Sequence, residues 1–250
     1  MNIETKNLIK TYNDTTVLNL TDKNSRLFFE SGKMHGILGP NGSGKSTLMK
    51  IMARLIPQTS GAVLYDSHPE DVDTQKAITY SSHRPILFSR TVFENIAYPL
   101  KIRKQPKDEI QSIVTELLDD FEISAIQNND AKNISGGESQ KTALARALSF
   151  SPEVLFLDEP TANIDPKSVK LIESVLLKRK ESHDLNVIII THNLSQAFRI
   201  CDSLTFLDQG ACLYSGPPQG LIESSNPFIH EFISFNTLKA WLSSKILIIY

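Results

Sequence analysis

The sequence contains few of the features that mark secreted, membrane-spanning or metal-binding proteins. Its two cysteines, Cys201 and Cys212, do not form a C-x-x-C pair, so zinc and thiol-redox motifs are not supported. No stretch reaches the roughly 18 consecutive apolar residues that a membrane helix needs. The segment Met1–Lys6 lacks the apolar core of a signal peptide. These absences predict a soluble chain with free thiols in a reducing, cytoplasmic compartment.

An excess of charge of either sign is also missing. The chain has 26 basic and 28 acidic residues, which gives a formal net charge of −2. A chain of this kind has no general electrostatic attraction to nucleic acid, so we expect no nucleic-acid partner. With 250 residues and 40% hydrophobic residues, the chain can bury a sizeable core. Its length suits one large α/β domain, or one domain with a lobe.

The spacing of apolar residues predicts strands that alternate with helices. Apolar residues recur at helical spacing over residues 48–55, and this pattern predicts a helix that Pro57 ends. Val154–Leu157 and Val187–Ile190 are short apolar runs, which are typical of buried parallel strands. Between them, Asp165-Pro166 has the N-cap and first-turn proline of a helix start. The pattern therefore predicts an α/β fold with a parallel sheet covered on both faces.

A glycine-rich segment between a predicted strand and a predicted helix fits the pattern G-x-x-x-x-G-K-[ST] at every position. Glycines let successive backbone N–H groups point at phosphate oxygens, and the helix N-terminus adds a positive dipole. Lys45 would reach the β- and γ-phosphates, and the Ser46 hydroxyl would ligate Mg²⁺. The predicted phosphate cradle consists of Gly39, Pro40, Asn41, Gly42, Ser43, Gly44, Lys45, Ser46 and Thr47.

Two carboxylates, Asp158 and Glu159, directly follow the predicted strand Val154–Leu157. Ligands of such sheets bind beyond the carboxyl ends of the strands. Asp158 is therefore predicted to hold Mg²⁺. Glu159, one residue further, is predicted to act on the attacking water during nucleotide hydrolysis.

A second predicted anion-binding site lies at Ser135-Gly136-Gly137, where another helix begins. It stands 90 residues after Lys45. One active site does not obviously need both elements. Two chains arranged head to tail would use one element of each kind per nucleotide.

Together these motifs resemble the ATP-binding cassette family, the ATPase subunits of ABC transporters. The resemblance covers about residues 1–225, leaving a tail at 226–250 that has no counterpart. It implies a P-loop NTPase (RecA-like) core with a mainly parallel sheet, an N-terminal antiparallel β subdomain and an inserted α-helical subdomain at about residues 84–150. ATP and Mg²⁺ are the implied cofactors.

The resemblance also implies roles for two further residues. His192, which follows Val187–Ile190, is similar to the switch histidine that contacts the γ-phosphate in this family. The implied catalytic residues are thus Glu159, His192 and Lys45. Tyr12 is similar to the aromatic residue that stacks on adenine, and a plain strand residue is the alternative interpretation.

The sequence departs from the family pattern at two positions. A glutamine that senses Mg²⁺ and water is expected near Tyr80–Pro85, but the whole window from Lys76 to Lys104 contains none. His83 aligns with it and is therefore included among the predicted metal-site residues. Glu138 stands where many members carry glutamine, and its negative charge is unfavourable near a triphosphate unless the side chain points away.

The resemblance implies an ATPase that powers import of a solute through a separate membrane permease subunit. The implied partners are that permease, a second copy of the chain and, indirectly, a solute-binding protein. The chain would lie on the cytoplasmic face of the membrane, with residues 91–100 forming part of the docking groove. An oxyanion such as tungstate, molybdate or phosphate is the favoured solute. The alternatives are the ATPase subunit of an amino-acid importer or an exporter, and a non-transport ABC ATPase.

Overall fold

The protein, described here by a computed structural model of residues 1–21, 26–69, 71–162 and 164–246, contains two β-sheets. The smaller sheet is antiparallel, with β1 at its centre and three further strands paired to it. Asn13 and Asp14 have φ values of 44° and 66°, so the hairpin between the first two strands turns through left-handed conformations. The strands are β1 (Ile3–Tyr12), β2 (Thr15–Leu20), β3 (Phe28–Phe29) and β5 (Ser60–Tyr65).

The larger sheet has six strands in the order β10-β9-β4-β8-β7-β6. All neighbouring pairs are parallel except β10 with β9. This sheet confirms the predicted α/β fold, including the two apolar runs that form β7 and β8. Its strands are β4 (Met34–Leu38), β6 (Ile78–Ser81), β7 (Val154–Asp158), β8 (Asn186–Ile190), β9 (Ser203–Asp208) and β10 (Ala211–Gly216).

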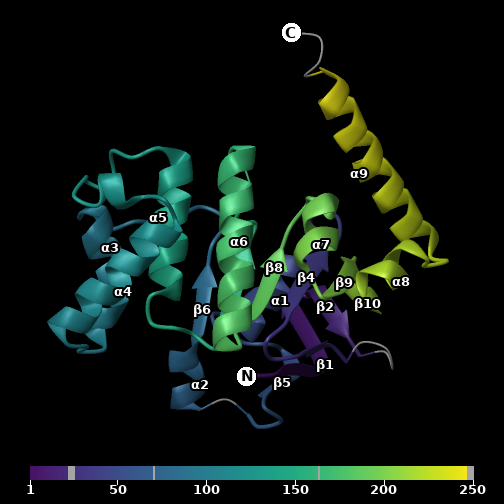
Figure 1. The fold of residues 1–250 in the computed structure, drawn as a ribbon. Helices are drawn as coiled ribbons and strands as arrows, with labels where there is room; N and C mark the ends of the chain where they lie inside the picture. The colour runs from purple at the N-terminus through teal and green to yellow at the C-terminus, as the bar shows by residue number, and fades with distance from the viewer. Residues whose placement is uncertain (22–25, 70, 163, 247–250) are drawn as a thin grey trace.

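The helices lie around this sheet, and three of them gather at one side of it (Figure 1). Those three are α3 (Val92–Ile102), α4 (Lys107–Asp120) and α5 (Gly136–Leu148). The final helix points away from the body of the protein (Figure 1). The other elements are α1 (Lys45–Met52), α2 (Val72–Ala77), the 3₁₀ turn η1 (Ser124–Ile126), α6 (Pro166–His183), α7 (Leu194–Ile200), α8 (Pro218–Ile222) and α9 (Pro227–Ile246). Among the described residues, none of the helices combines the length and the hydropathy that a membrane crossing requires.

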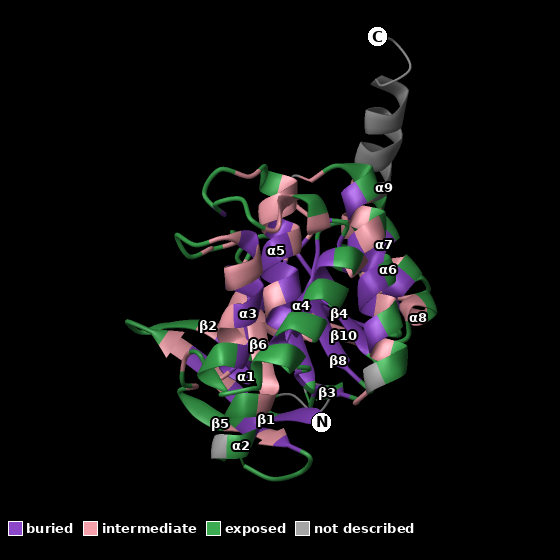
Figure 2. Ribbon diagram, turned by 60° about the vertical axis from the view of Figure 1, so that its left-hand side comes forward, coloured by how far each residue is buried: buried purple, intermediate pink, exposed green. Residues whose placement is uncertain are grey.

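The large sheet is buried on both faces. Along β7, Leu155 and Leu157 belong to one apolar core with the helices, whereas Val154 and Phe156 belong to another with α1 and the small sheet. Figure 2 shows these central strands as buried beneath the surrounding elements. Side chains of a strand alternate between its two faces, so a wholly apolar run is what a doubly covered strand requires.

One expectation about local structure is wrong. Helix α1 ends at Met52 rather than near Pro57, because Arg54 takes a left-handed conformation with φ of 60° and Leu55 is 54% exposed. A left-handed residue just after a helix redirects the chain, which apolar spacing does not reveal. The tail is mostly helical, as α9, and residues 247–250 lie outside the described residues.

Candidate functional site

The glycine-rich loop joins β4 to α1, at the carboxyl edge of the large sheet. It forms a pocket with Val17 and Glu159, lined by Asn41, Gly42, Gly44, Lys45, Ser46 and Thr47. A Cβ atom on Gly39 would lie 2.0 Å from the carbonyl oxygen of Leu207, and one on Gly44 would lie 2.8 Å from Leu18. Both glycines also have positive φ, so the loop can take this shape only with glycine at these positions.

Lys45 is held inside this loop. Its side chain, which is only 6% exposed, donates to the carbonyl oxygens of Gly39 at 2.9 Å and Pro40 at 2.7 Å. Burial lowers its pKa, although the carboxylates of Glu159 and Asp158 oppose this shift. The nearby Ser43 hydroxyl is buried and has no hydrogen-bond partner within the described part of the chain. The loop therefore concentrates donor groups where a phosphate would supply acceptors.

Asp158 ends β7, and both of its oxygens are engaged. Ser46 Oγ donates to Oδ1 at 3.3 Å, and Tyr80 on β6 donates its hydroxyl to Oδ2 at 2.9 Å. Burial and the Asp158 charge raise the pKa of Tyr80 well above its usual range. The described residues contain no group of three or more His, Cys, Asp or Glu side chains that could hold a metal. Mg²⁺ often takes one or two protein oxygens and completes its shell with phosphates and water, so the Ser46–Asp158 pair fits this ion.

Glu159 lies beside two imidazole rings. Its Oε1 is 2.8 Å from Nε2 of His192, and its Oε2 is 3.6 Å from Nδ1 of His83. The Glu159 backbone donates to the carbonyl of Ile190 at 3.0 Å and has a left-handed φ of 53°. The carboxylate thus faces the pocket of the glycine-rich loop with one oxygen paired to His192.

Of the predicted metal-site residues, only Ser46 and Asp158 contact each other. His83 is 43% exposed, and the contact found for it is with Glu159. Its assignment to the metal site stays a prediction.

Ser135, Gly136 and Gly137 do not line the pocket of the glycine-rich loop. Ser135 caps α5, and Glu138 turns back to accept from its backbone N–H at 2.8 Å and its hydroxyl at 2.7 Å. These hydrogen bonds with Ser135 lower the pKa of Glu138. The carboxylate is therefore directed at the N-terminus of its own helix, as in a capping box.

Tyr12, at the end of β1, is 44% exposed and does not line the loop pocket either. The Lys10 ammonium makes a cation–π contact with its ring, with Nζ 4.6 Å from the ring centroid. The ring is accessible to a ligand, but the predicted adenine contact stays a prediction.

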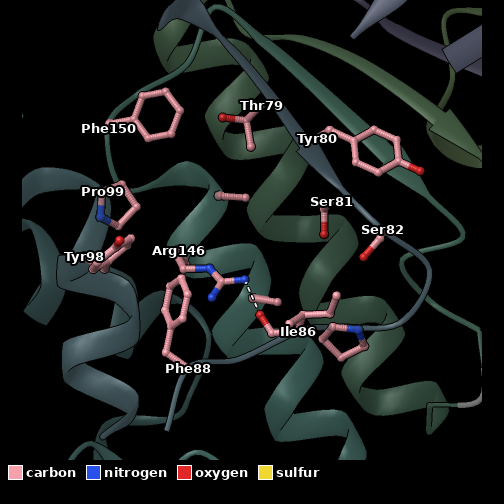
Figure 3. A pocket seen from close by; sticks show the side chains of 13 residues that line it. Thr79, Tyr80, Ser81, Ser82, Ile86, Phe88, Tyr98, Pro99, Arg146 and Phe150 are labelled. Atoms are coloured by element: carbon pink, nitrogen blue, oxygen red, sulfur yellow. Dashed lines mark hydrogen bonds between the residues drawn. The ribbon is translucent and has the colours of Figure 1, made fainter. Parts of the chain in front are cut away.

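A separate groove lies between β6 and the helices α3 and α5, and Figure 3 shows its side chains. Arg146 crosses it, donating to the carbonyl of Ile86 at 2.7 Å and lying over the ring of Phe88 at 5.2 Å. Tyr98 lines the groove, whereas Ile96 is fully buried in the core. The groove is lined by Thr79, Tyr80, Ser81, Ser82, Pro85, Ile86, Phe88, Tyr98, Pro99, Ala143, Arg146, Ala147 and Phe150.

Sequence reasoning missed two parts of the site. The contact between Ser135 and Glu138 was predictable from the sequence, because S-x-x-E is the signature of a capping box. The bond from Tyr80 to Asp158 has no local signal, because it joins neighbouring strands that are far apart in the sequence.

Comparisons with known proteins give one family. The model of the ABC transporter family matches residues 23–162. The chain is 43% identical over 210 residues to the tungstate uptake system ATP-binding protein TupC of Peptoclostridium acidaminophilum, a match that covers 84% of this chain and 96% of that protein. It is 37% identical to the methionine import ATP-binding protein MetN of Francisella tularensis subsp. holarctica, covering 83% of this chain. The chain spans only 62% of the length of that relative.

A solved structure supports the same assignment. The structure of cbiO1 from Clostridium perfringens, part of the ABC transporter complex cbiONQ, has a TM-score of 0.80 and 28% identity. The match covers 89% of this chain and 90% of that one. By sequence and by fold, the chain belongs to the ABC transporter family, as an ATP-binding subunit that hydrolyses ATP.

Proposed function

We propose that the chain powers the import of an oxyanion of the tungstate type through a separate membrane subunit. The observation that carries the solute class is the 43% identity to TupC, which extends over 96% of that relative. Methionine is the second candidate, because of the 37% identity to MetN. It is less favoured because the chain spans 62% of that relative.

The nucleotide site supports a division of labour among its residues. The backbone N–H groups of the glycine-rich loop and Lys45 bind the phosphates of ATP. Ser46 and Asp158 hold Mg²⁺, which offsets the negative charge that develops on the phosphate oxygens. Tyr12 offers its exposed ring to the adenine.

Glu159 accepts the proton of the attacking water as the general base. A general base must lie within hydrogen-bond reach of its water, and Glu159 borders the pocket that the loop forms. His192 orients the carboxylate through its 2.8 Å contact. It would also donate to the γ-phosphate of bound ATP. This assignment predicts that Glu159→Gln still binds ATP and lowers kcat at least about 100-fold.

A second copy of the chain completes each nucleotide site. Ser135, Gly136 and Gly137 stand apart from the loop pocket of their own protomer, and Ser135 and Gly136 are exposed. Two protomers therefore enclose two ATP molecules, each between one chain's Lys45 and the other chain's Ser135. The Glu159→Gln variant tests this by accumulating as a dimer with ATP in size-exclusion chromatography. If it stays monomeric at saturating ATP, the shared site is wrong.

The membrane subunit docks in the groove that Arg146 crosses. The groove is lined by aromatic side chains, and the Arg146 guanidinium lies over the ring of Phe88. Such a surface is suited to a partner helix that has an apolar face. The chain then sits peripherally at the cytoplasmic face of the membrane, and the solute-binding protein acts on it only through the membrane subunit.

The solute is tested with the complex as it exists. The tagged chain is purified from membranes of its own host with the subunits bound to it, and the complex is placed in liposomes. Tungstate, molybdate or methionine is then supplied with the binding protein, and ATP hydrolysis is measured. Stimulation by tungstate supports the proposal, whereas stimulation by methionine alone contradicts it.

A further inference from the structure

One buried amide joins the two loops that carry Glu159 and His192. Gln196, on α7, is completely buried. Its Oε1 accepts from the hydroxyl of Thr161 at 3.1 Å and from that of Thr191 at 2.8 Å. Thr161 stands two residues after Glu159, and Thr191 directly precedes His192. The same oxygen therefore binds both loops just beside the 2.8 Å contact between Glu159 and His192.

A charged pair on the other side fixes the orientation of this amide. The Gln196 Nε2 donates to Oε1 of Glu173, a residue of α6 that is 5% exposed. A carboxylate can only accept, so the amide nitrogen must face Glu173 and the amide oxygen must face the two hydroxyls. Arg199 neutralises the carboxylate with two hydrogen bonds, at 3.0 and 2.6 Å. Glu173 in turn raises the pKa of Arg199.

Further hydrogen bonds fix which groups of the network donate and which accept. The Thr191 hydroxyl donates to Gln196 and accepts from the backbone N–H of Asn193 at 3.1 Å. Asn193 caps α7 by accepting from the Gln196 backbone at 3.0 Å. Each of these groups has a defined donor or acceptor role, and reversing one leaves another without a partner.

The network joins the two loops that carry Glu159 and His192 to helices α6 and α7. Helices α6 and α7 contribute to the same apolar core against the large sheet, and the amide connects them to the ends of β7 and β8. An apolar side chain of similar size could fill this space, but it would supply none of the three side-chain hydrogen bonds. Buried polar groups are costly unless every partner is satisfied, which here is the case for Gln196 Oε1 and Nε2.

We propose that Gln196 is a positioning residue, which fixes the separation of Glu159 and His192 during ATP hydrolysis. The inference rests on the roles proposed for Glu159 and His192. Gln196 does not line the pocket of the glycine-rich loop. Its loss should therefore affect turnover and leave ATP binding largely unchanged.

The test is steady-state ATP hydrolysis by the full chain, with kcat and KM measured separately. Gln196→Leu should lower kcat by about 10- to 100-fold, because small displacements of catalytic groups have effects of this size, and change KM for ATP less than about twofold. Thr161→Val, which removes one hydroxyl and keeps the volume, should lower kcat by about threefold. This milder variant keeps the proposal testable if Gln196→Leu does not fold.

A charge exchange tests the direction of the amide. Gln196→Glu places a second carboxylate against Glu173 and should lower kcat as Gln196→Leu does. The double variant Gln196→Glu/Glu173→Gln restores one carboxylate facing one amide, and should recover kcat to within about threefold of the parent. Asn186→Leu is the matched control, since it removes another fully buried amide, which binds the carbonyls of Met1 and Phe29. It should lower Tm without lowering kcat.

Several results would overturn the inference. An unchanged kcat in Gln196→Leu would do so, as would a raised KM with unchanged kcat. If kcat of the double variant is no higher than kcat of Gln196→Glu or Glu173→Gln alone, the network has only a structural role. Glu159→Gln, assayed alongside, separates the two levels: if that variant turns over at the parental rate, the proposed role of Glu159 fails, whatever the Gln196 variants show.

Discussion

The two glycine-containing anion sites differ in why they need glycine. In the glycine-rich loop, a Cβ on Gly39 would lie 2.0 Å from the Leu207 carbonyl oxygen, and φ of this glycine is +141°. At the start of α5, a Cβ on Gly136 would meet nothing within 4 Å, and one on Gly137 would have its nearest neighbour at 3.9 Å. The protomer's own packing excludes side chains from the first site but not from the second.

The difference shows which parts of the site a single chain can build. The glycine-rich loop is shaped by the strands and loops around it, and Lys45 is already held there. At the start of α5, Ser135 and Gly136 are exposed, and the space that a Cβ on Gly136 would enter is open. Small side chains at an exposed helix start let a second molecule approach the backbone closely. This asymmetry supports the proposal that a second copy supplies the other half of each site.

The largest effect is expected from Lys45, on the side that the chain builds alone. Lys45→Ala removes a buried ammonium that we expect at the β- and γ-phosphates, and kcat/KM for ATP should fall about 1,000-fold or more. Circular dichroism should show an intact fold. Unchanged hydrolysis would contradict the assignment of the loop.

A substitution at Gly136 tests the side that requires a partner. Gly136→Gln adds a neutral side chain in open space, so Tm should not fall, while ATP hydrolysis should fall about tenfold or more because the added side chain obstructs the second protomer. Binding of ATP to the single protomer should persist.

Gly39→Ala is the matched counterpart, because its methyl group clashes within the protomer. It should lower the free energy of unfolding by about 2–5 kcal/mol, as measured by urea denaturation. If Gly136→Gln instead destabilises the chain and Gly39→Ala does not, the comparison between the two sites is wrong.

The sequence predicts the parts of the site that lie in contiguous motifs, but it does not predict the contacts that depend on tertiary packing. Contiguous motifs predict the loop at Gly39–Ser46, the carboxylates at the end of β7 and the histidine after β8, because short apolar runs locate the strand ends. Their convergence follows from the parallel order of the sheet, in which strand ends meet at one edge. The register that pairs Tyr80 with Phe156, and so brings the Tyr80 hydroxyl to Asp158, depends on tertiary packing.

The contacts of Gln196 are the clearest limit of sequence reasoning. Its partners Thr161, Glu173 and Thr191 come from two loops and a helix, and no spacing rule connects them. The burial of Ile96 was also not predictable, since an apolar residue on an amphipathic helix faces either a core or a groove. The end of α1 depends on the left-handed conformation of Arg54, which is not a residue that favours such turns.

A smaller effect is expected at Glu138. Its carboxylate accepts from the backbone N–H and hydroxyl of Ser135, the groups proposed to bind the ATP phosphate of the second protomer. Glu138→Gln keeps an acceptor for the helix cap and removes a negative charge near the second protomer's ATP. In the Glu159→Gln background, the ATP concentration for half-maximal dimerisation should fall about threefold.

The chain offers a matched control for this substitution. Glu94 forms the same capping box with Thr91 at the start of α3. Glu94→Gln should change the cap in the same way and leave ATP-driven dimerisation unaltered. An equal shift in both variants would trace the effect to the cap alone, and the charge argument would fail.

The smallest effect is expected at His83, on the side of the site that the chain builds alone. Its imidazole is 43% exposed and lies 3.6 Å from Glu159, beyond normal hydrogen-bond distance, so it contributes weakly to the position of that carboxylate. His83→Gln restores the amide that the family pattern has here, and kcat should stay the same or rise by up to about threefold. His83→Leu, which removes all polar contact, should lower kcat by a similar factor. A near-complete loss of turnover in His83→Gln would show that the imidazole has a role that an amide cannot replace.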